Sequence, residues 1–446
     1  MKNKETLFIL LSAYSIRTNN IASKRIEKMA KYLSFYAETI LVNSVPNRLN
    51  ENNNSLKFKF EIGNALLIEV PTKRSPTNYK IKGYTNSKTH SLTFHSVKKE
   101  LYPILSYILP FSTGGMLFHD ASLIEEKITN IIKENLNKNI VLFTSYDPWF
   151  VLKMGFSLKK KFPQIFWVAD FRDPSFDCHE GIITRTNLFR KLTKKVLKNS
   201  NLATVVSKKM EKDYKNLSED SKVLYLPNGF DEEDLLKFPK INNNISCENF
   251  LIVYTGSLHS KTVDIIPFVK ALILLKNKDY FTQIKVIYAG KNGNYVANIF
   301  KNYGILSSLK IIGDIDRTEA LKLQNIADLL LLITYTGNNR KIGNGIVTGK
   351  FYEYISTNNI ILAIGTEDWE MKELLESDGV SKVFDWNKTK EISNYIETIY
   401  INKVKKGKSY KVNRKWKRQF EYKYISNLLY EEVSKQIRLI NQENRN

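Results

Sequence analysis

The 446-residue chain contains only two cysteines, Cys178 and Cys247, and only five histidines. Two cysteines this far apart exclude a disulfide framework and are typical of a protein from a reducing cytoplasm. The histidines lack the paired spacing of zinc ligands, so we expect no metal site. No apolar run reaches about eighteen uninterrupted residues, and the sequence therefore predicts no membrane-spanning helix.

The start of the chain has lysines before a short apolar run, which faintly resembles a signal peptide. However, Glu5 precedes the run, the run is only about seven residues long, and no small-residue cleavage site follows it. We therefore expect residues 7–11 to form the first strand of a core.

Acidic residues are few relative to basic ones. The chain has 45 Asp and Glu against 68 Lys and Arg, which gives a net charge of +23. Residues 71–99, 185–198 and 402–420 contain no acidic residue at all. Such an excess indicates an anionic partner, which leaves nucleic acid, an anionic membrane surface and phosphorylated substrates as alternatives. A basic run can equally be ordinary solvated surface, so the charge alone does not choose between them.

Short apolar segments alternate with helical patterns almost throughout the chain. The expected strands are residues 7–11, 39–42, 65–68, 140–144, 165–169, 202–206, 250–254, 284–289, 309–312, 329–333 and 360–364. The expected helices are residues 23–34, 123–136, 189–197, 265–275, 318–326 and 349–355. Most of these strands are continuous apolar runs, as parallel strands covered on both faces are.

Strand and helix alternate in this way in both halves of the chain, which predicts an α/β protein with two doubly wound domains. A lysine- and asparagine-rich interval separates the two halves. The predicted organisation is an N-terminal domain at 1–207, a linker region at 208–247, a C-terminal domain at 248–405 and a basic C-terminal helix at 406–446.

The most informative segment is residues 343–365, which read GNGIVTGKFYEYISTNNIILAIG. Thr348 is placed to cap a short helix, and Gly349 lets a ligand approach the backbone closely. Free amides at a helix start, with Lys350 beside them, suit a phosphate group. Glu353 lies one turn further on and can accept hydrogen bonds from two sugar hydroxyls. The segment therefore predicts a nucleotide site.

This segment is also close to the phosphate-binding loop of nucleotide triphosphatases. That motif needs a Ser or Thr after its lysine to hold magnesium, and here Phe351 stands in that place. A triphosphatase is therefore disfavoured.

A second cluster follows the strand at 165–169 and contains Asp170, Arg172 and Asp173. In doubly wound sheets, ligands bind at the carboxyl ends of the strands, where such a set can position hydroxyls and phosphates. An internal ion pair that only fixes the loop is the alternative. Further polar residues follow neighbouring strands of the N-terminal half, and they are Asn20, Ser23, Arg25, Tyr146 and Asp147.

In the C-terminal half, the residues that follow strands are Gly256, Lys261, Gly313 and Asp314. Asp314 and Asp316 flank one isoleucine and could hold a divalent ion, although loop solvation is the more frequent role of such a pair. We expect no metal here.

With these residues in place, the chain resembles glycosyltransferases of the GT-B fold, in the broad family 4 group of bacterial capsule, lipopolysaccharide and exopolysaccharide enzymes. The resemblance extends over most of the chain in the right order. It rests on the segments IASKR (21–25), VADFRDP (168–174), TVVS (204–207), YLPNGFD (225–231), VYTGSL (253–258), GDIDRTEALKLQNIAD (313–328), TGKFYEYI (348–355) and ILAIG (361–365).

The resemblance implies two Rossmann-like domains facing a cleft, with a C-terminal helix that crosses back to the N-terminal domain. It implies that Glu353 binds the ribose of a nucleotide sugar and that the amides near Thr348, Gly349 and Lys350 meet the diphosphate. The loop at 313–316 would face the base, and Lys261 would be a diphosphate lysine. Asp170, Arg172 and Asp173 would be the catalytic set.

Four positions depart from the family pattern. Family members often have a second glutamate eight residues before the ribose glutamate, where this chain has Gly345. Asn19 and Asn20 replace a glycine pair in the first loop, and Ser257 stands where many members have an arginine.

The expected activity is therefore the transfer of a sugar from a nucleotide-diphosphate sugar to a lipid-linked saccharide during cell-surface polysaccharide synthesis. The resemblance implies that the anomeric configuration is retained. Because the sequence shows no clear metal site, we expect a metal-independent enzyme that uses no cofactor besides its donor substrate. The basic surfaces fit a cytoplasmic protein held peripherally at the inner face of the cell membrane. The alternatives are a GT-B-like sugar-nucleotide epimerase, an inactive homologue that binds sugar nucleotides, and a nucleic-acid-binding protein. We expect no nucleic acid, because the sequence shows no aromatic-studded RNA motif or recognition helix.

Overall fold

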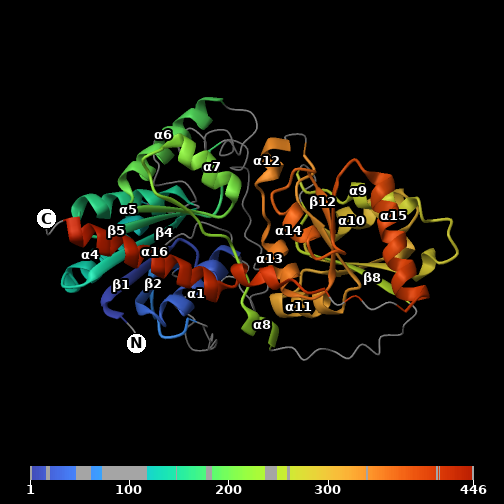
Figure 1. The fold of residues 1–446 in the computed structure, drawn as a ribbon, viewed down its shortest axis with the longest axis horizontal. Coiled ribbons are helices and arrows are strands. Elements are labelled where there is room, and N and C mark those ends of the chain that lie inside the picture. The colour runs from blue at the N-terminus through green and yellow to red at the C-terminus, as the bar shows by residue number, and fades with distance from the viewer. Residues whose placement is uncertain are drawn as a thin grey trace. The chain divides into compact units, whose positions relative to one another are not determined.

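The computed structural model describes residues 3–16, 21–46, 62–72, 118–146, 148–176, 183–236, 249–258, 262–337, 340–407, 410 and 412–443. The chain divides into two compact units (Figure 1). The first unit comprises Met1–Asn228 and Tyr422–Asn446, and the second comprises Gly229–Glu421. The division lies inside the interval 208–247, and the residues just before it still belong to the first sheet.

The first unit is a seven-stranded sheet of order β3-β2-β1-β4-β5-β6-β7. All of its neighbouring strands are parallel. Its strands are β1 Asn3–Ser12, β2 Ala37–Pro46, β3 Leu66–Thr72, β4 Asn139–Tyr146, β5 Phe166–Phe171, β6 Leu202–Val205 and β7 Val223–Tyr225. Its helices are α1 Ile21–Leu33, α4 Phe118–Glu134, α5 Trp149–Lys161, α6 Ile183–Asn199, α7 Lys208–Leu217 and α16 Tyr422–Glu443.

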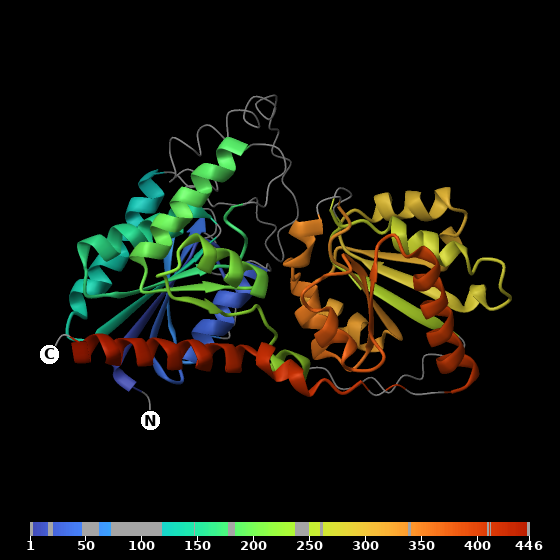
Figure 2. The same ribbon diagram turned by 45° about the horizontal axis from the view of Figure 1, so that its top comes forward.

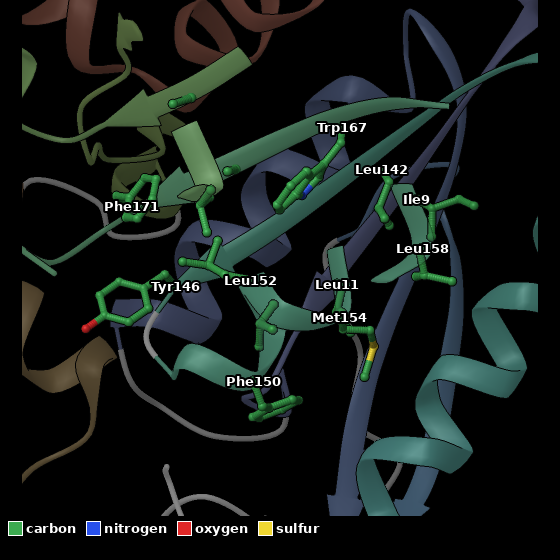
Figure 3. Packing of buried hydrophobic residues seen from close by; sticks show 14 of the residues in the cluster. Ile9, Leu11, Leu142, Tyr146, Phe150, Leu152, Met154, Leu158, Trp167 and Phe171 are labelled. Carbon is green, nitrogen blue, oxygen red and sulfur yellow. The ribbon is translucent and has the colours of Figure 1, made fainter. Parts of the chain in front are cut away.

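Helices cover this sheet on both faces. One core contains Ile9, Leu142 and Trp167 of the sheet together with Phe150 of α5 (Figure 3). Ile128 of α4 belongs to the same core. Successive residues of a strand point to opposite faces, so Phe8 and Leu10 enter the other core, which α1 and α16 cover. Burial on both faces explains why the strands read as continuous apolar runs.

The second unit is a six-stranded sheet of order β10-β9-β8-β11-β12-β13, again with parallel neighbours. Its strands are β8 Phe250–Thr255, β9 Ile284–Ala289, β10 Leu309–Gly313, β11 Leu329–Ile333, β12 Ile360–Gly365 and β13 Lys382–Asp385. Its helices are α8 Glu232–Leu236, α9 Ile266–Ile273, α10 Gly293–Asn302, α11 Arg317–Ile326, α12 Arg340–Asn344, α13 Gly349–Ser356, α14 Lys372–Glu376, α15 Thr389–Tyr400 and the short helices η1 Phe281–Gln283, η2 Leu306–Ser308, η3 Ile401–Lys405 and η4 Lys415–Phe420.

The last helix, α16, returns to the first unit after the chain has built the second, and in Figures 1 and 2 it lies beside α1. Ile425, Leu429 and Val433 recur every fourth residue, and each is fully buried. Tyr430 stacks on Tyr36, with 5.2 Å between the ring centres. The prediction of two doubly wound α/β domains with a returning C-terminal helix is confirmed.

None of the helices in the described ranges combines the length and apolar character needed to cross a membrane. The basic segment 73–99 and the apolar segment 101–117 lie outside the described residues.

Replacing Leu429 by Ala should lower the free energy of unfolding by roughly 2–5 kcal/mol, because loss of this buried side chain leaves a cavity in the core that α1 and α16 cover. Urea unfolding followed by circular dichroism measures this change. Leu439→Ala is the matched control in the same helix, because Leu439 is 43% exposed and its loss should cost less than about 0.5 kcal/mol. Equal effects of the two substitutions would contradict the packing of α16 against α1 and the sheet.

Candidate functional site

Each sheet has a point at which the strand order reverses, between β1 and β4 in the first unit and between β8 and β11 in the second. In open parallel sheets, ligands bind beyond the carboxyl ends of the strands at this point. In the second unit, Gly256 is the first residue after β8, and it therefore lies at the favoured position.

Gly256 has a backbone φ of +110°, a conformation that residues other than glycine rarely adopt. A Cβ at this residue would lie 2.3 Å from Cε and 3.1 Å from Nζ of Lys350. The Lys350 side chain therefore lies in the space that the missing side chain leaves above the end of β8. Its Nζ is 5.4 Å from the ring centre of Tyr254. A cation from α13 is thus held at the reversal point of the sheet.

The start of α13 supplies further polar groups. Thr348 has the extended backbone of a helix cap, but its side chain makes no hydrogen bond to the helix. The prediction that this side chain caps α13 is therefore wrong, and the Thr348 hydroxyl is buried without a hydrogen-bond partner. The first-turn amides of α13, at Gly349 and Lys350, consequently lack the side-chain acceptor of a capped helix. Burial lowers the pKa of Lys350, and the charge of Glu353 opposes this effect.

Glu353 lies one turn along α13, and its side chain is 21% exposed. The Nε of Arg317 donates a hydrogen bond to its Oε1 at 3.0 Å. The Nε2 of Gln324 donates to its Oε2 at 3.2 Å. The carboxylate is therefore held by a cation and an amide while part of it still meets solvent.

Gln324 also joins this carboxylate to the end of β8. Its Nε2 donates to Oγ1 of Thr255 at 2.9 Å, and the backbone N–H of Thr255 donates to the hydroxyl of Tyr354 at 3.0 Å. Burial raises the pKa of Tyr354 to about 12, so this hydroxyl keeps its proton. Strand β8, helix α11 and helix α13 are thereby fixed around one site.

The remaining predicted residues of the C-terminal half are more dispersed. Gly313 ends β10, the edge strand two positions from β8, and Asp314 follows it. Asp316 caps α11 by accepting a hydrogen bond from the Glu319 N–H at 3.0 Å. Lys261 lies outside the described residues. In the described ranges, no group of three or more His, Cys, Asp or Glu side chains is placed to hold a metal ion.

In the first unit, Asp170 is fully buried within β5 and forms an ion pair with Arg25, which is buried as completely. The Nη2 of Arg25 donates to its Oδ1 at 2.9 Å, and the hydroxyls of Ser145 and Thr204 each donate to the carboxylate at 2.7 Å. Arg25 also donates to the backbone oxygens of Pro227, at 2.5 Å, and Leu226, at 3.0 Å.

This network joins α1 to the carboxyl ends of β4, β5 and β6. Since the Asp170 side chain has no exposed surface and accepts from three neighbouring side chains, it is placed as a structural group. The sequence offered an ion pair inside the loop as the alternative; the pair that Asp170 forms is instead with Arg25 of α1. Direct contact of either side chain with a substrate is not supported by this arrangement.

The other predicted residues of the N-terminal half fall into two groups. Ser23 is buried in α1, and Tyr146 is buried against Trp149. Tyr146 also lies beside Phe171 (Figure 3). Arg172 and Asp173, in contrast, follow β5 at the carboxyl edge of the sheet. Arg172 is half-buried there, and Asp173 is exposed. The Arg172 guanidinium carbon lies 5.5 Å from the ring centre of Tyr14. Asn20 and Asp147 lie outside the described residues.

Arg317 and Gln324, the two residues that hold Glu353, are not among the site residues that the sequence predicts. Both lie in the segment 313–328 that carries part of the family resemblance, but nothing in the local sequence connects them to a glutamate in another helix. The available signal was that α11 follows a strand end directly, which brings its first turn to the ligand edge of the sheet.

Replacing Asp170 by Asn should lower the free energy of unfolding by about 3–5 kcal/mol, because it leaves the Arg25 charge buried without its counter-ion. Asp173→Asn, three residues further on and exposed, should cost less than about 0.5 kcal/mol. Chemical denaturation of the two variants measures the difference. If Asp170→Asn unfolds like the unchanged protein, the buried pair is not a stabilising element of the first unit.

No model of a known protein family matches this sequence. No curated protein matches it significantly either. Solved structures, however, match along nearly the whole chain. The N-terminal domain of trehalose-6-phosphate phosphatase from Candida albicans matches with a TM-score of 0.62 at 13% identity, covering 98% of each chain.

Sucrose-phosphate synthase from Thermosynechococcus elongatus matches with a TM-score of 0.61 at 11% identity, covering 98% of this chain and 100% of that one. The Anabaena protein HepE in complex with UDP-glucose matches with a TM-score of 0.55 at 13% identity, covering 96% and 99%. At such low identity these similarities show the fold alone. The chain has the two-domain α/β fold of the GT-B proteins.

Proposed function

We propose that this protein is a glycosyltransferase that binds a nucleotide-diphosphate sugar on its second unit. The observation that carries the proposal is the position of Lys350 over Gly256 at the reversal point of the sheet, with Glu353 one turn along the same helix. A cation and helix-start amides suit a diphosphate, and a partly exposed carboxylate suits a pair of hydroxyls. A nucleotide sugar contains both groups.

The structural relatives support this class of donor. HepE is described in complex with UDP-glucose, and a related Escherichia coli structure with a TM-score of 0.60 contains UDP-2-fluoro glucose. We therefore propose a nucleoside diphosphate sugar as the donor of this chain, bound by Gly256, Thr348, Gly349, Lys350 and Glu353.

Transfer breaks the bond between the anomeric carbon and the diphosphate oxygen and forms a bond from that carbon to an acceptor oxygen. The departing diphosphate gains negative charge as its bond breaks, and the acceptor hydroxyl gives up its proton to the departing diphosphate. Lys350 and the first-turn amides of α13 are placed to stabilise that charge without rearranging. A metal-independent reaction with retention of configuration remains our proposal.

We assign acceptor binding to the carboxyl edge of the first unit, at Arg172 and Asp173. The exposed carboxylate of Asp173 can accept a hydrogen bond from an acceptor hydroxyl and orient it for attack. A lipid-linked saccharide of a cell-surface polysaccharide pathway is the acceptor that the family resemblance favours.

A basic surface of the first unit supports such an acceptor. Helix α6 contains no acidic residue and exposes Lys191, Lys194 and Lys198, while Lys160 of α5 and Lys195 of α6 both lie over the ring of Phe156. Basic side chains near an anionic bilayer contribute attraction of about 1 kcal/mol each. We propose that this surface holds the protein at the cytoplasmic face of an anionic membrane, where lipid-linked acceptors lie.

Replacing Gly256 by Ala should weaken the binding of UDP-glucose at least about tenfold, because the new Cβ collides with Lys350 and displaces its charge. Gly379→Ala is the matched control, since Gly379 also has a positive φ, +78°, but has open space around its Cβ. Isothermal titration with UDP-, GDP- and ADP-sugars measures the affinities. If no nucleotide sugar binds, or if both variants bind like the unchanged protein, the proposed donor site is wrong. Conversion of a donor to its epimer without an acceptor would instead favour the epimerase.

Reversing three charges of α6, by Lys191→Glu, Lys194→Glu and Lys198→Glu together, should reduce sedimentation with phosphatidylglycerol vesicles, and added salt should reduce it further. The control carries the same charge change on the second unit, at Lys270, Lys276 and Lys301. Binding that is equal for both triple variants, or that persists on purely zwitterionic vesicles, would contradict the assignment of this surface. Salt-sensitive binding of RNA in place of vesicles would favour the nucleic-acid alternative.

A further inference from the structure

Arg317 is held in a fixed position at the first turn of α11. Asp316 before it caps the helix through the Glu319 N–H, which defines where the helix begins. The guanidinium then extends to two carboxylates from other parts of the second unit. Its Nη1 donates to Oδ2 of Asp234 in α8 at 2.5 Å, and its Nε donates to Oε1 of Glu353 in α13 at 3.0 Å.

The three side chains are mostly withdrawn from solvent. Arg317 is 23% exposed, Asp234 is 11% exposed and Glu353 is 21% exposed. Burial alone would lower the pKa of Arg317, but the neighbouring carboxylates of Glu353 and Asp234 raise it above its ordinary value. The arginine therefore keeps its charge, and its planar shape fixes the direction of both carboxylates.

The amide of Gln324 completes the arrangement. Its Nε2 donates to Oε2 of Glu353 at 3.2 Å, so each oxygen of this carboxylate accepts one hydrogen bond from the protein. A carboxylate offers about four acceptor positions, two on each oxygen. Counting the described residues, one position therefore remains on each oxygen, so that the two hydroxyls of a vicinal diol can each donate to a different oxygen.

We propose that Arg317 is a positioning residue that fixes the Glu353 carboxylate for the vicinal diol of a ribose, with Asp234 as its anchor. This inference rests on the proposed nucleotide-sugar function and adds the selection of ribonucleotides over deoxyribonucleotides. Arg317 contacts the recognising carboxylate and not the diol, so its loss should remove discrimination more than binding of the rest of the nucleotide.

The test is isothermal titration of the full chain with UDP, GDP and ADP and with their 2′-deoxy forms. The unchanged protein should bind its preferred ribonucleotide about tenfold more tightly than the deoxy form, since a hydrogen bond to a charged group is lost in the latter. In Arg317→Met this ratio should fall close to one, with the deoxy form bound almost as before. Arg317→Lys should give an intermediate ratio, because an ammonium keeps the charge but not the planar fork.

Lys278→Met is the control, because it removes an ion pair of 3.3 Å with Glu397 elsewhere in the same unit and should leave the ratio unchanged. A ratio in Arg317→Met equal to that of the unchanged protein would overturn the inference, even if both affinities fall, because a purely structural role weakens both ligands alike. If that variant does not fold, the ratio in Arg317→Lys decides in the same way.

Two further outcomes distinguish the role of Arg317 from the proposed nucleotide-sugar function. Nucleoside diphosphates that bind the unchanged protein without preference for ribose would overturn the inference and leave the proposed function standing. Failure of all three ribonucleoside diphosphates to bind would reject the proposed function, and the inference with it.

Discussion

Parallel hydrogen bonding between all neighbouring strands is the constraint on which the rest of this structure depends. Parallel strands must be connected by crossovers, and the helices of those crossovers cover both faces of each sheet. Apolar side chains then fill both faces, so residues that are to meet a polar ligand are restricted to the strand ends. The carboxyl edge is the one that collects the loops and helix starts, and Asp170, Arg172 and Gly256 lie at or near it.

The two units use this edge differently. In the first unit, a buried arginine and a buried aspartate join four elements below the edge, and their charges neutralise each other. In the second unit, a glycine at the end of β8 leaves space that a lysine from another helix enters. The first arrangement consolidates a fold, whereas the second holds a cation and a partly exposed carboxylate within reach of a ligand.

Much of the fold could be predicted from the sequence, because β11 is an uninterrupted apolar run and only Lys285 interrupts the apolar run of β9. The predicted bounds of both strands agree with the structure. The sequence does not predict β13, an edge strand of four residues, because Lys382 and Asp385 at its two ends leave only two apolar residues between them. The sequence predicts no helix over α5, because the turn residue Pro148 directly precedes its first residue, Trp149. In both places the local sequence disfavours a regular element, and packing against the rest of the unit forms it nevertheless.

The candidate site was only partly predictable. Lys350 and Glu353 stand out because a glycine and a helix start precede them, yet their partners Gly256 and Arg317 are distant in sequence and only the fold brings them close. Asp170 was expected to meet a ligand because it is a carboxylate at a strand end. It lies inside β5, beside Thr204 of β6, and among the described residues its carboxylate accepts hydrogen bonds from Arg25, Ser145 and Thr204. The role of each site residue in donor binding stays a prediction.

The most direct test of the central claim is a crystal structure of the protein with a bound nucleotide sugar, such as UDP-glucose. We expect the diphosphate to lie against Lys350 and the first-turn amides of α13, above Gly256, with the ribose hydroxyls on the Glu353 carboxylate. A nucleotide bound elsewhere, for example at the carboxyl edge of the first unit with Lys350 and Glu353 uncontacted, would contradict this assignment.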